Sequence, residues 1–133
     1  MVKLKTSNTD QFEIEFCEGL LKKIPHFFEA MVLLGDLYTK VGRYQDGLAI
    51  DEKLYQIDPE NPVILYNLAC SYSLMNHIDL SFRSLKKAIT CGYDDYRHIE
   101  HDLDLENLKK DKRFQKYFAA LNKKRTTFFS DHA

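Results

Sequence analysis

The feature that most constrains the fold is a self-similarity at a displacement of 34 residues. Shifting the sequence by this amount places apolar and small residues on residues of the same kind, as in the pairs Met31 and Leu65, Leu34 and Leu68, Gly35 and Ala69, and Tyr38 and Tyr72. Each period holds two segments whose apolar residues recur every three or four positions, which is the spacing of one face of an α-helix. A period of this length built from two helices predicts an elongated stack of helix pairs.

Residues that start or end helices separate these segments. Gly42 and Gly92 each follow a helical pattern, and glycine readily takes the left-handed conformation that closes a helix. Asn61 and Pro62 combine a capping side chain with a proline in the first turn. The pattern therefore predicts helices over residues 27–40, 44–57, 61–76 and 79–91.

Helical patterns also flank the two periods. Phe12, Phe16 and Leu20 lie on one face of a predicted helix over residues 10–24, which Pro25 ends. In the 34-residue register this helix is the second of a pair whose first helix is missing, so the array is expected to begin with half a unit. On the other side, helices are predicted over residues 95–101, 103–109 and 112–123.

Residues 10–125 resemble a tetratricopeptide-repeat array. The positions that match are Leu34, Gly35, Tyr38, Gly42, Tyr44, Leu54 and Pro59 in one unit, and Leu65, Leu68, Ala69, Tyr72, Leu85 and Ala88 in the next. A following segment of the form D-x-D-L-x-x-L-(K/R)-x-D-x-R-F resembles the closing helices of such arrays, with Asp102, Asp104, Leu105, Leu108, Lys109, Asp111, Arg113 and Phe114. The resemblance implies an all-α fold, an αα-superhelix of antiparallel helix pairs wound as a right-handed solenoid.

The resemblance also suggests the division of the chain. It predicts a flexible N-terminus (1–9), one domain (10–125) and a flexible tail (126–133), the domain comprising a half repeat (10–25), two repeats (28–61 and 62–95) and capping helices (96–125). Three residues depart from the family pattern. Gly47 stands where the family has alanine, Asp51 where it has an aromatic residue, and Leu103 where its capping segment has proline. At the helix pair that holds Gly47 and Asp51 we expect looser packing, or a water or polar partner near Asp51.

The first helix of each pair lines an inner groove in this family, and the resemblance implies that the groove binds a peptide or a partner protein. The residues predicted to face it are Val32, Leu33, Asp36, Lys40, Val63, Tyr66, Asn67, Cys70, Leu74, Arg97 and His101. They predict a groove with an apolar base, an amide for backbone contact and a basic end. The alternative is that they cover a small core or face solvent.

Chaperone-binding members of the family hold a C-terminal carboxylate with lysine, asparagine and arginine side chains. Only Asn67 matches that set, because Val32 and Asp36 replace its first lysine and asparagine. Arg97 and His101 imitate its last pair only weakly. An aspartate at position 36 would repel a carboxylate by roughly 1 kcal/mol at short range, so the sequence disfavours this ligand.

No pattern of catalytic or metal-binding residues is found in the sequence. Cys17, Cys70 and Cys91 are isolated, odd in number and lack the spacing of a zinc site or a disulfide framework. His98 and His101 have no third ligand at a recognisable spacing, and there is no glycine-rich phosphate loop. We therefore expect neither catalysis, nor a metal, nor a cofactor.

The net charge of −1 provides no field that would attract nucleic acid or an anionic membrane, and no apolar run is long enough to span a bilayer. Isolated thiols and the lack of an apolar signal segment predict a cytoplasmic location. The sequence thus predicts a non-enzymatic module for protein–protein interaction. The alternative is a self-associating scaffold that forms a homo-oligomer through its N-terminal half repeat.

Overall fold

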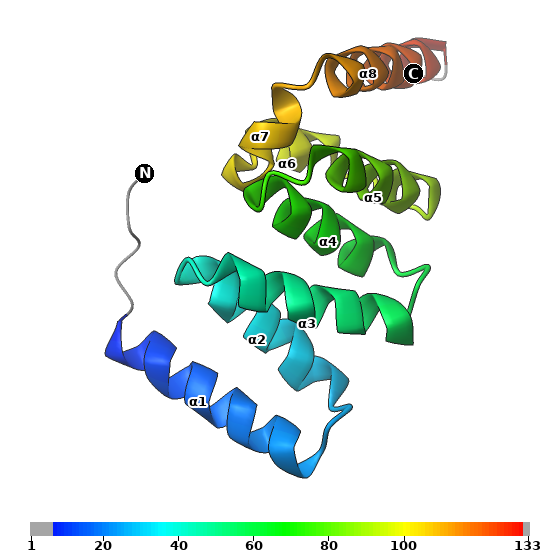
Figure 1. Ribbon diagram of the computed structural model, residues 1–133. Helices are drawn as coiled ribbons and strands as arrows, with labels where there is room; N and C mark the ends of the chain where they lie inside the picture. The colour runs from blue at the N-terminus through cyan, green and yellow to red at the C-terminus, as the bar shows by residue number, and fades with distance from the viewer. Residues whose placement is uncertain (1–6, 132–133) are drawn as a thin grey trace.

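The computed structural model describes residues 7–131, with side chains described as far as residue 126. This part of the chain is helical and contains no strand (Figure 1). The elements are α1 (Asn8–Lys23), α2 (Phe28–Lys40), α3 (Tyr44–Ile57), α4 (Pro62–Leu74), α5 (Ile78–Thr90), α6 (Tyr96–His101), the 3₁₀ turn η1 (Leu103–Leu105), α7 (Glu106–Lys109) and α8 (Lys112–Asp131). The parts of the predicted flexible termini at residues 1–6 and 132–133 lie outside the described residues.

The helices are stacked in chain order, and from α1 to α5 each packs against the next (Figure 1). After α5 the stack is closed differently, because η1 and α7 both return to α4. This is the predicted all-α solenoid of helix pairs. The helix bounds agree with the predicted ones to within two residues, except at the end of α8.

The repeat is visible in the backbone of the turns. Gly42 and Asn76, 34 residues apart, both have positive φ angles, of 84° and 60°. In each turn the amide of the next residue reaches back to a tyrosine carbonyl, Arg43 to Tyr38 and His77 to Tyr72, both at 2.8 Å. The same left-handed closure therefore ends the first helix of both pairs.

Gly35 allows α2 and α3 to approach closely. A methyl group at this position would lie 3.0 Å from Asp51 Oδ1 and 3.4 Å from a methyl carbon of Ile50. The Asp51 side chain, for which a polar partner was one expectation, accepts a hydrogen bond from the Ser71 hydroxyl of α4. Gly35, Asp51 and Ser71 thus form one close contact among α2, α3 and α4.

Two clusters of buried residues form the core. The N-terminal core joins α1, α2, α3 and the first turn of α4 and contains Ile14, Cys17, Met31, Leu34, Leu37, Tyr38, Val41, Ile50, Leu54 and Ile64. The C-terminal core joins α4 to α8 and contains Leu65, Tyr66, Ala69, Cys70, Phe82, Leu85, Ala88, Ile99, Leu105, Leu108, Phe114 and Phe118. Tyr55 packs against both clusters. The boundary between the two cores therefore lies at the packing of α3 on α4.

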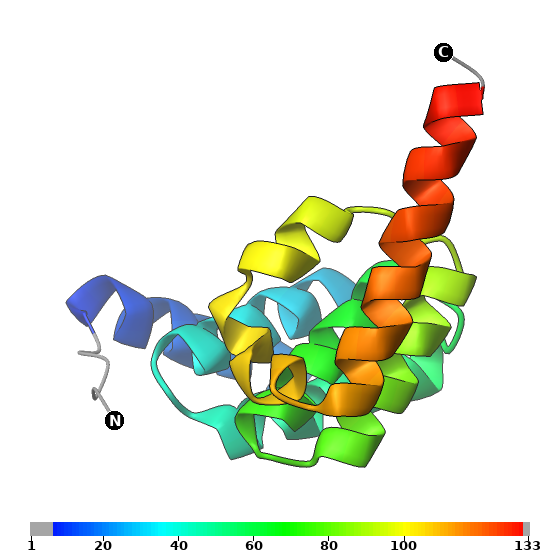
Figure 2. The ribbon, with the colours of Figure 1, turned by 90° about the horizontal axis from the view of Figure 1, so that it is seen from above.

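The C-terminal helix is longer than predicted. The sequence predicts its end at Lys123, whereas α8 continues to Asp131 and extends beyond the rest of the array (Figure 2). Phe114 and Phe118 anchor its first half in the C-terminal core. Backbone hydrogen bonding continues the helix where apolar periodicity has ended. Residues 126–131, which the sequence assigns to a flexible tail, are thus helical.

Candidate ligand groove

A groove of about 500 Å³ opens between α2, α4 and the segment from α6 to η1. Helices α2 and α4 are the first helices of the two pairs, so the groove lies on the face predicted for a ligand. Its lining residues are Asp36, Thr39, Lys40, Tyr44, Asp51, Tyr66, Asn67, Cys70, Ser71, His98, Asp102 and Asp104.

The structure brings together in this groove the predicted residues Asp36, Lys40, Tyr66, Asn67 and Cys70. They come from one side of α2 and one side of α4. Tyr66 and Cys70 are also part of the C-terminal core. The Asn67 side chain is half-buried and forms no hydrogen bond with any other described residue, so its amide is available to a ligand.

Four other predicted residues on the same helices do not line the groove. Leu33 and Val63 are exposed, to 45% and 56%. Val32 packs against the N-terminal core, and Leu74 is half-buried at the end of α4. The predicted apolar base is therefore replaced by aromatic and polar side chains.

The predicted basic end is not part of the groove. Arg97 and His101 line a separate hollow between α6 and α8, together with Tyr96, Glu100, Asn122, Arg125 and Thr126. His98 of α6 faces the groove instead. Adjacent helical residues point about 100° apart, and the sequence of this six-residue helix does not define its rotation.

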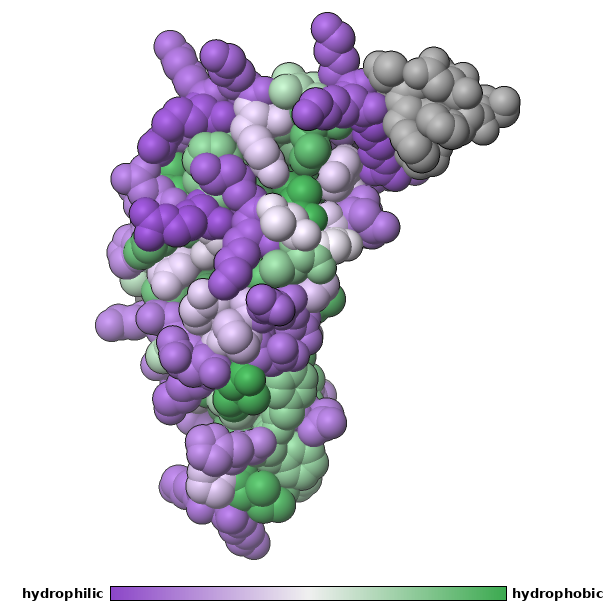
Figure 3. Space-filling view, turned by 90° about the vertical axis from the view of Figure 1, so that its right-hand side faces the viewer, coloured by the Kyte–Doolittle hydropathy of each residue, from purple (hydrophilic) through white to green (hydrophobic). Residues whose placement is uncertain are grey.

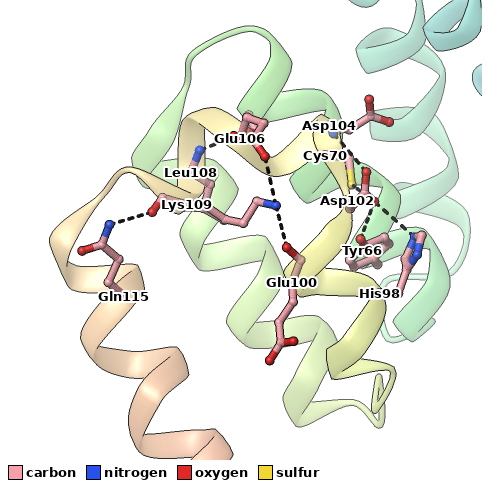
Figure 4. Close-up of polar contacts among 11 residues, drawn as sticks. Tyr66, Cys70, His98, Glu100, Asp102, Asp104, Glu106, Leu108, Lys109 and Gln115 are labelled. Carbon is pink, nitrogen blue, oxygen red and sulfur yellow. Dashed lines mark hydrogen bonds and ion pairs between the residues drawn. The ribbon is translucent and has the colours of Figure 1, made fainter.

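Asp102 is the centre of a polar cluster at one end of the groove (Figure 4). Its carboxylate accepts hydrogen bonds from the Tyr66 hydroxyl and from the Cys70 thiol, the latter at 3.7 Å, and lies 3.2 Å from His98 Nε2. Its other oxygen accepts the backbone amide of Asp104 at 3.0 Å. The first acid of the D-x-D motif thus caps η1 and ties the closing segment to α4.

Aromatic packing makes the Tyr66 side chain rigid. Its ring stacks on Tyr93, with centroids 4.2 Å apart and planes 5° apart, and lies 5.5 Å from the His98 ring. Burial raises the pKa of the Tyr66 phenol, so it remains a hydrogen-bond donor to Asp102. On the other side of the closing segment, Lys109 donates to the Glu100 carbonyl at 3.0 Å (Figure 4).

Asp36 and Asp104 have a different environment, since neither side chain has a hydrogen-bond or ion-pair partner among the described residues. Figure 4 shows the Asp104 carboxylate pointing away from that of Asp102. Burial raises the pKa of both carboxyl groups. For Asp104 the neighbouring negative charge of Asp102 adds to this effect.

Asp51 is the most buried acid of the groove, with 5% of the residue exposed. Its Oδ2 accepts the Ser71 hydroxyl, whereas Oδ1 has no hydrogen-bond donor in the described part of the chain. Burial is the main reason why the pKa of this carboxyl group is raised to about 7, and the charge of Asp36 contributes. Near neutral pH the site therefore holds a carboxyl group close to its titration midpoint.

The lysine and the histidine of the groove each have a carboxylate partner. Lys40 Nζ lies 2.9 Å from Asp10 Oδ1 of α1, and His98 is paired with Asp102. The lining thus has four carboxyl groups against one lysine and one histidine, and the lysine is matched by an acid outside the groove. The groove is acidic.

Sequence reasoning did not predict the lining residues Thr39, Tyr44, Asp51, Ser71, His98, Asp102 and Asp104. In the sequence, the D-x-D motif indicates only a capping segment. Its carboxyl groups reach the groove because η1 returns to α4. No cluster of three His, Cys, Asp or Glu residues within residues 7–131 could hold a metal ion. No helix in that range is both long and apolar enough to span a membrane.

Three curated proteins are similar to parts of this chain. A chloroplastic protein of Arabidopsis thaliana is 36% identical over 80 residues, which are 58% of this chain and 24% of that protein. The peroxisomal targeting signal receptors of Komagataella phaffii and Komagataella pastoris are each 28% identical over 106 residues, 76% of this chain and 18% of theirs. The chain thus spans a quarter or less of these relatives. No family model matches the chain, and no solved structure does.

Proposed function

We propose that this chain is a tetratricopeptide-type interaction module, and that the groove between α2, α4 and η1 binds an extended peptide segment of a partner protein. The observation that carries the proposal is the groove itself, built by the first helices of two consecutive repeats. Its volume of about 500 Å³ lies within the roughly 300–1,000 Å³ of ordinary ligand sites.

The chemistry of the lining supports a peptide rather than a reacting substrate. The free amide of Asn67 can donate to and accept from a peptide backbone. The Tyr66 ring, which stacks on Tyr93, lines the groove together with Asn67. Asp102 is engaged in the cluster that holds the closing segment, and Cys70 is a buried thiol whose pKa is raised by burial, which makes it a poor nucleophile.

The similarity to a receptor for a targeting signal supports the same class of function. It covers three quarters of this chain, a share that must include most of the helices. The proposal does not extend to that receptor's signal, because most of that protein has no counterpart here.

Photo-crosslinking tests the proposal. A benzoylphenylalanine at position 67 lies in the groove, whereas one at position 45, an exposed residue of α3, provides the control. We expect partner segments captured from position 67 to bind as synthetic peptides, and Asn67→Ala to weaken that binding about tenfold. Equal capture at both positions, or peptides whose affinity Asn67→Ala leaves unchanged, would contradict the assignment of the groove.

A second candidate function, self-association, is favoured by the outer face of α1. Phe12, Phe16 and Ile24 are exposed to 68%, 58% and 50%, and the two phenylalanine rings stack on each other at 6.4 Å. In the repeat register Phe16 corresponds to Ile50, which is buried against α2. Figure 3 shows hydrophobic residues gathered toward the α1 end of the molecule. A second copy of the chain could cover this face.

Sedimentation equilibrium separates the two candidates. If α1 mediates association, the wild type will form concentration-dependent dimers, and Phe16→Glu will be monomeric with an unchanged helix content. Asn67→Ala should leave the dimer intact because the groove is separate from this face. A wild type that stays monomeric at all concentrations rejects self-association without affecting the groove.

A further inference from the structure

The groove has an excess of negative charge that its own residues do not compensate. Lys40 Nζ is ion-paired with Asp10, and His98 Nε2 lies against the Asp102 carboxylate, so neither side chain is paired with Asp36 or Asp104. Asp36 on α2 and Asp104 on η1 face the same hollow from opposite walls and have no partner in the described chain. Asp36 is exposed and Asp104 is half-buried, so both carboxylates are accessible to a positive charge that enters the groove.

Asp51 provides an independent indication of a missing partner. The residue is 5% exposed, yet Oδ1 has no hydrogen-bond donor among the side chains described, those of residues 7–126, although the Asp51 side chain lines the groove. Every fully enclosed side-chain nitrogen or oxygen in that range has a hydrogen-bond partner, so Oδ1 opens into the groove rather than being sealed beneath it. A donor that enters the groove from outside would satisfy this oxygen.

The kind of cation follows from the geometry of the acids. The described residues contain no group of three ligands close enough for a metal ion, so the carboxyl groups are too dispersed for a compact divalent cation. A lysine or arginine side chain carries several donors and has an apolar stem. Such a stem can lie along the aromatic side chains of the lining, Tyr44 and Tyr66, with its charged end among the carboxylates.

We infer that the groove recognises a lysine or arginine side chain of the partner segment, held between Asp36 and Asp104 with Asp51 at the bottom of the site. The inference rests on the proposed function, since it names the chemistry of the peptide that the groove binds. It also separates this groove from sites in which lysine, asparagine and arginine hold a peptide carboxylate.

Fluorescence anisotropy with labelled peptide pools tests the inference on the whole chain. The probes are end-blocked nonapeptide pools whose central residue is lysine, arginine, norleucine or glutamate and whose flanking residues are randomised. Norleucine matches the stem of lysine without its charge. The proteins are the wild type, Asp36→Asn, Asp104→Asn and the control Asp94→Asn, which removes an exposed acid outside the groove.

We expect the lysine and arginine pools to bind the wild type about tenfold more tightly than the norleucine pool, and the glutamate pool to bind most weakly. Asp36→Asn and Asp104→Asn should each reduce the preference for lysine over norleucine by about threefold to tenfold. Asp94→Asn should leave it unchanged. Because Asp36 and Asp104 have no partners to lose, both variants should melt no lower than the wild type.

Equal binding of the lysine and norleucine pools overturns the inference, as does a lysine preference that survives in the combined Asp36→Asn and Asp104→Asn variant. In either case the proposed function stands if Asn67→Ala still weakens every pool. If no pool binds, the proposed function fails and the inference fails with it.

Discussion

The Ser71 hydroxyl of α4 donates a hydrogen bond to the Asp51 carboxylate of α3, and both residues are buried where the two cores meet. The contact places a titratable group inside the helical array, at a position where the repeat that the sequence resembles has an aromatic ring. Several properties of the molecule should depend on this carboxyl group.

The first prediction concerns pH. Burial raises the pKa of Asp51 to about 7 from its ordinary value of 3.8, so between these values the folded state holds a proton that the unfolded state releases. The contribution of Asp51 to the free energy of unfolding therefore falls as pH rises through this window, by on the order of 1.4 kcal/mol per pKa unit. It is fully present below about pH 4 and lost above about pH 7.

Asp51→Asn tests this prediction, because the amide oxygen still accepts the Ser71 hydroxyl. Urea denaturation at a series of pH values should show the variant gaining stability over the wild type from pH 4 to pH 7. Comparing the two proteins removes the contribution of the other acids, including Asp10 and Asp111, whose pKa values are lowered. If the free energies of unfolding of the two proteins change in parallel with pH, the pKa of Asp51 is not raised by folding.

Gly35 and Asp51 should be energetically coupled. A methyl group at position 35 would crowd Asp51 Oδ1, so Gly35→Ala alone is expected to cost about 1 kcal/mol despite the better helix propensity of alanine. In an Asp51→Ala background the crowding is gone, and the same change should stabilise by about 0.5–1 kcal/mol. A double-mutant cycle measured by urea denaturation checks this sign reversal. Equal effects in both backgrounds would contradict the close contact.

The two left-handed turns give a third prediction. Gly42 has a φ of 84°, so Gly42→Ala should lower the free energy of unfolding by about 1 kcal/mol. Asn76 also has a positive φ, of 60°, and Asn76→Gly should raise the free energy of unfolding by about 0.5 kcal/mol. Gly19→Ala is the matched control, because Gly19 lies within α1 with open space around it. This substitution should raise the free energy of unfolding by about 1 kcal/mol. Thermal melts will rank the three variants, and a stabilising Gly42→Ala would contradict the turn geometry.

The fourth prediction tests the attachment of the closing segment to α4. Tyr66→Phe removes the donor to Asp102 while keeping the stacked ring, and should cost about 1–2 kcal/mol. Tyr72→Phe removes a hydroxyl with no described hydrogen-bond partner and should change stability by less than about 0.5 kcal/mol. Denaturant unfolding compares the two. If Tyr66→Phe and Tyr72→Phe lower the free energy of unfolding by similar amounts, the Asp102 cluster contributes little to holding η1.

Sequence patterns that repeat at 34 residues predicted the fold well, because each repeated position has a local physical cause. Gly42 closes a helix, and Gly35 permits close approach, wherever the rest of the chain lies. A polar partner for Asp51 could also be expected from its break with the repeat pattern. The sequence could not identify that partner as Ser71. The partner depends on which residue of α4 faces α3, and Ser71 lies 20 residues away from Asp51 in the chain.

The candidate site was predictable only in part, because it combines repeated and unrepeated elements. Asp36 and Asn67 follow from the repeat register, which fixes the faces of α2 and α4. The third wall comes from α6 and η1, where periodicity ends and the rotation of a six-residue helix decides whether Arg97 or His98 faces the groove. Only the return of η1 to α4 shows that the groove is acidic rather than basic at this end.

The groove crosses the boundary between the two cores. Asp36 and Tyr44 reach it from the N-terminal half, whereas Asn67 and Asp102 reach it from the C-terminal half. An occupant that touches both walls loses its contacts when either half opens, so its binding free energy is available only while both are folded together. Occupancy would thus make two neighbouring folding units melt as one, and ligand binding would be detectable as sharper cooperativity of unfolding as well as higher stability.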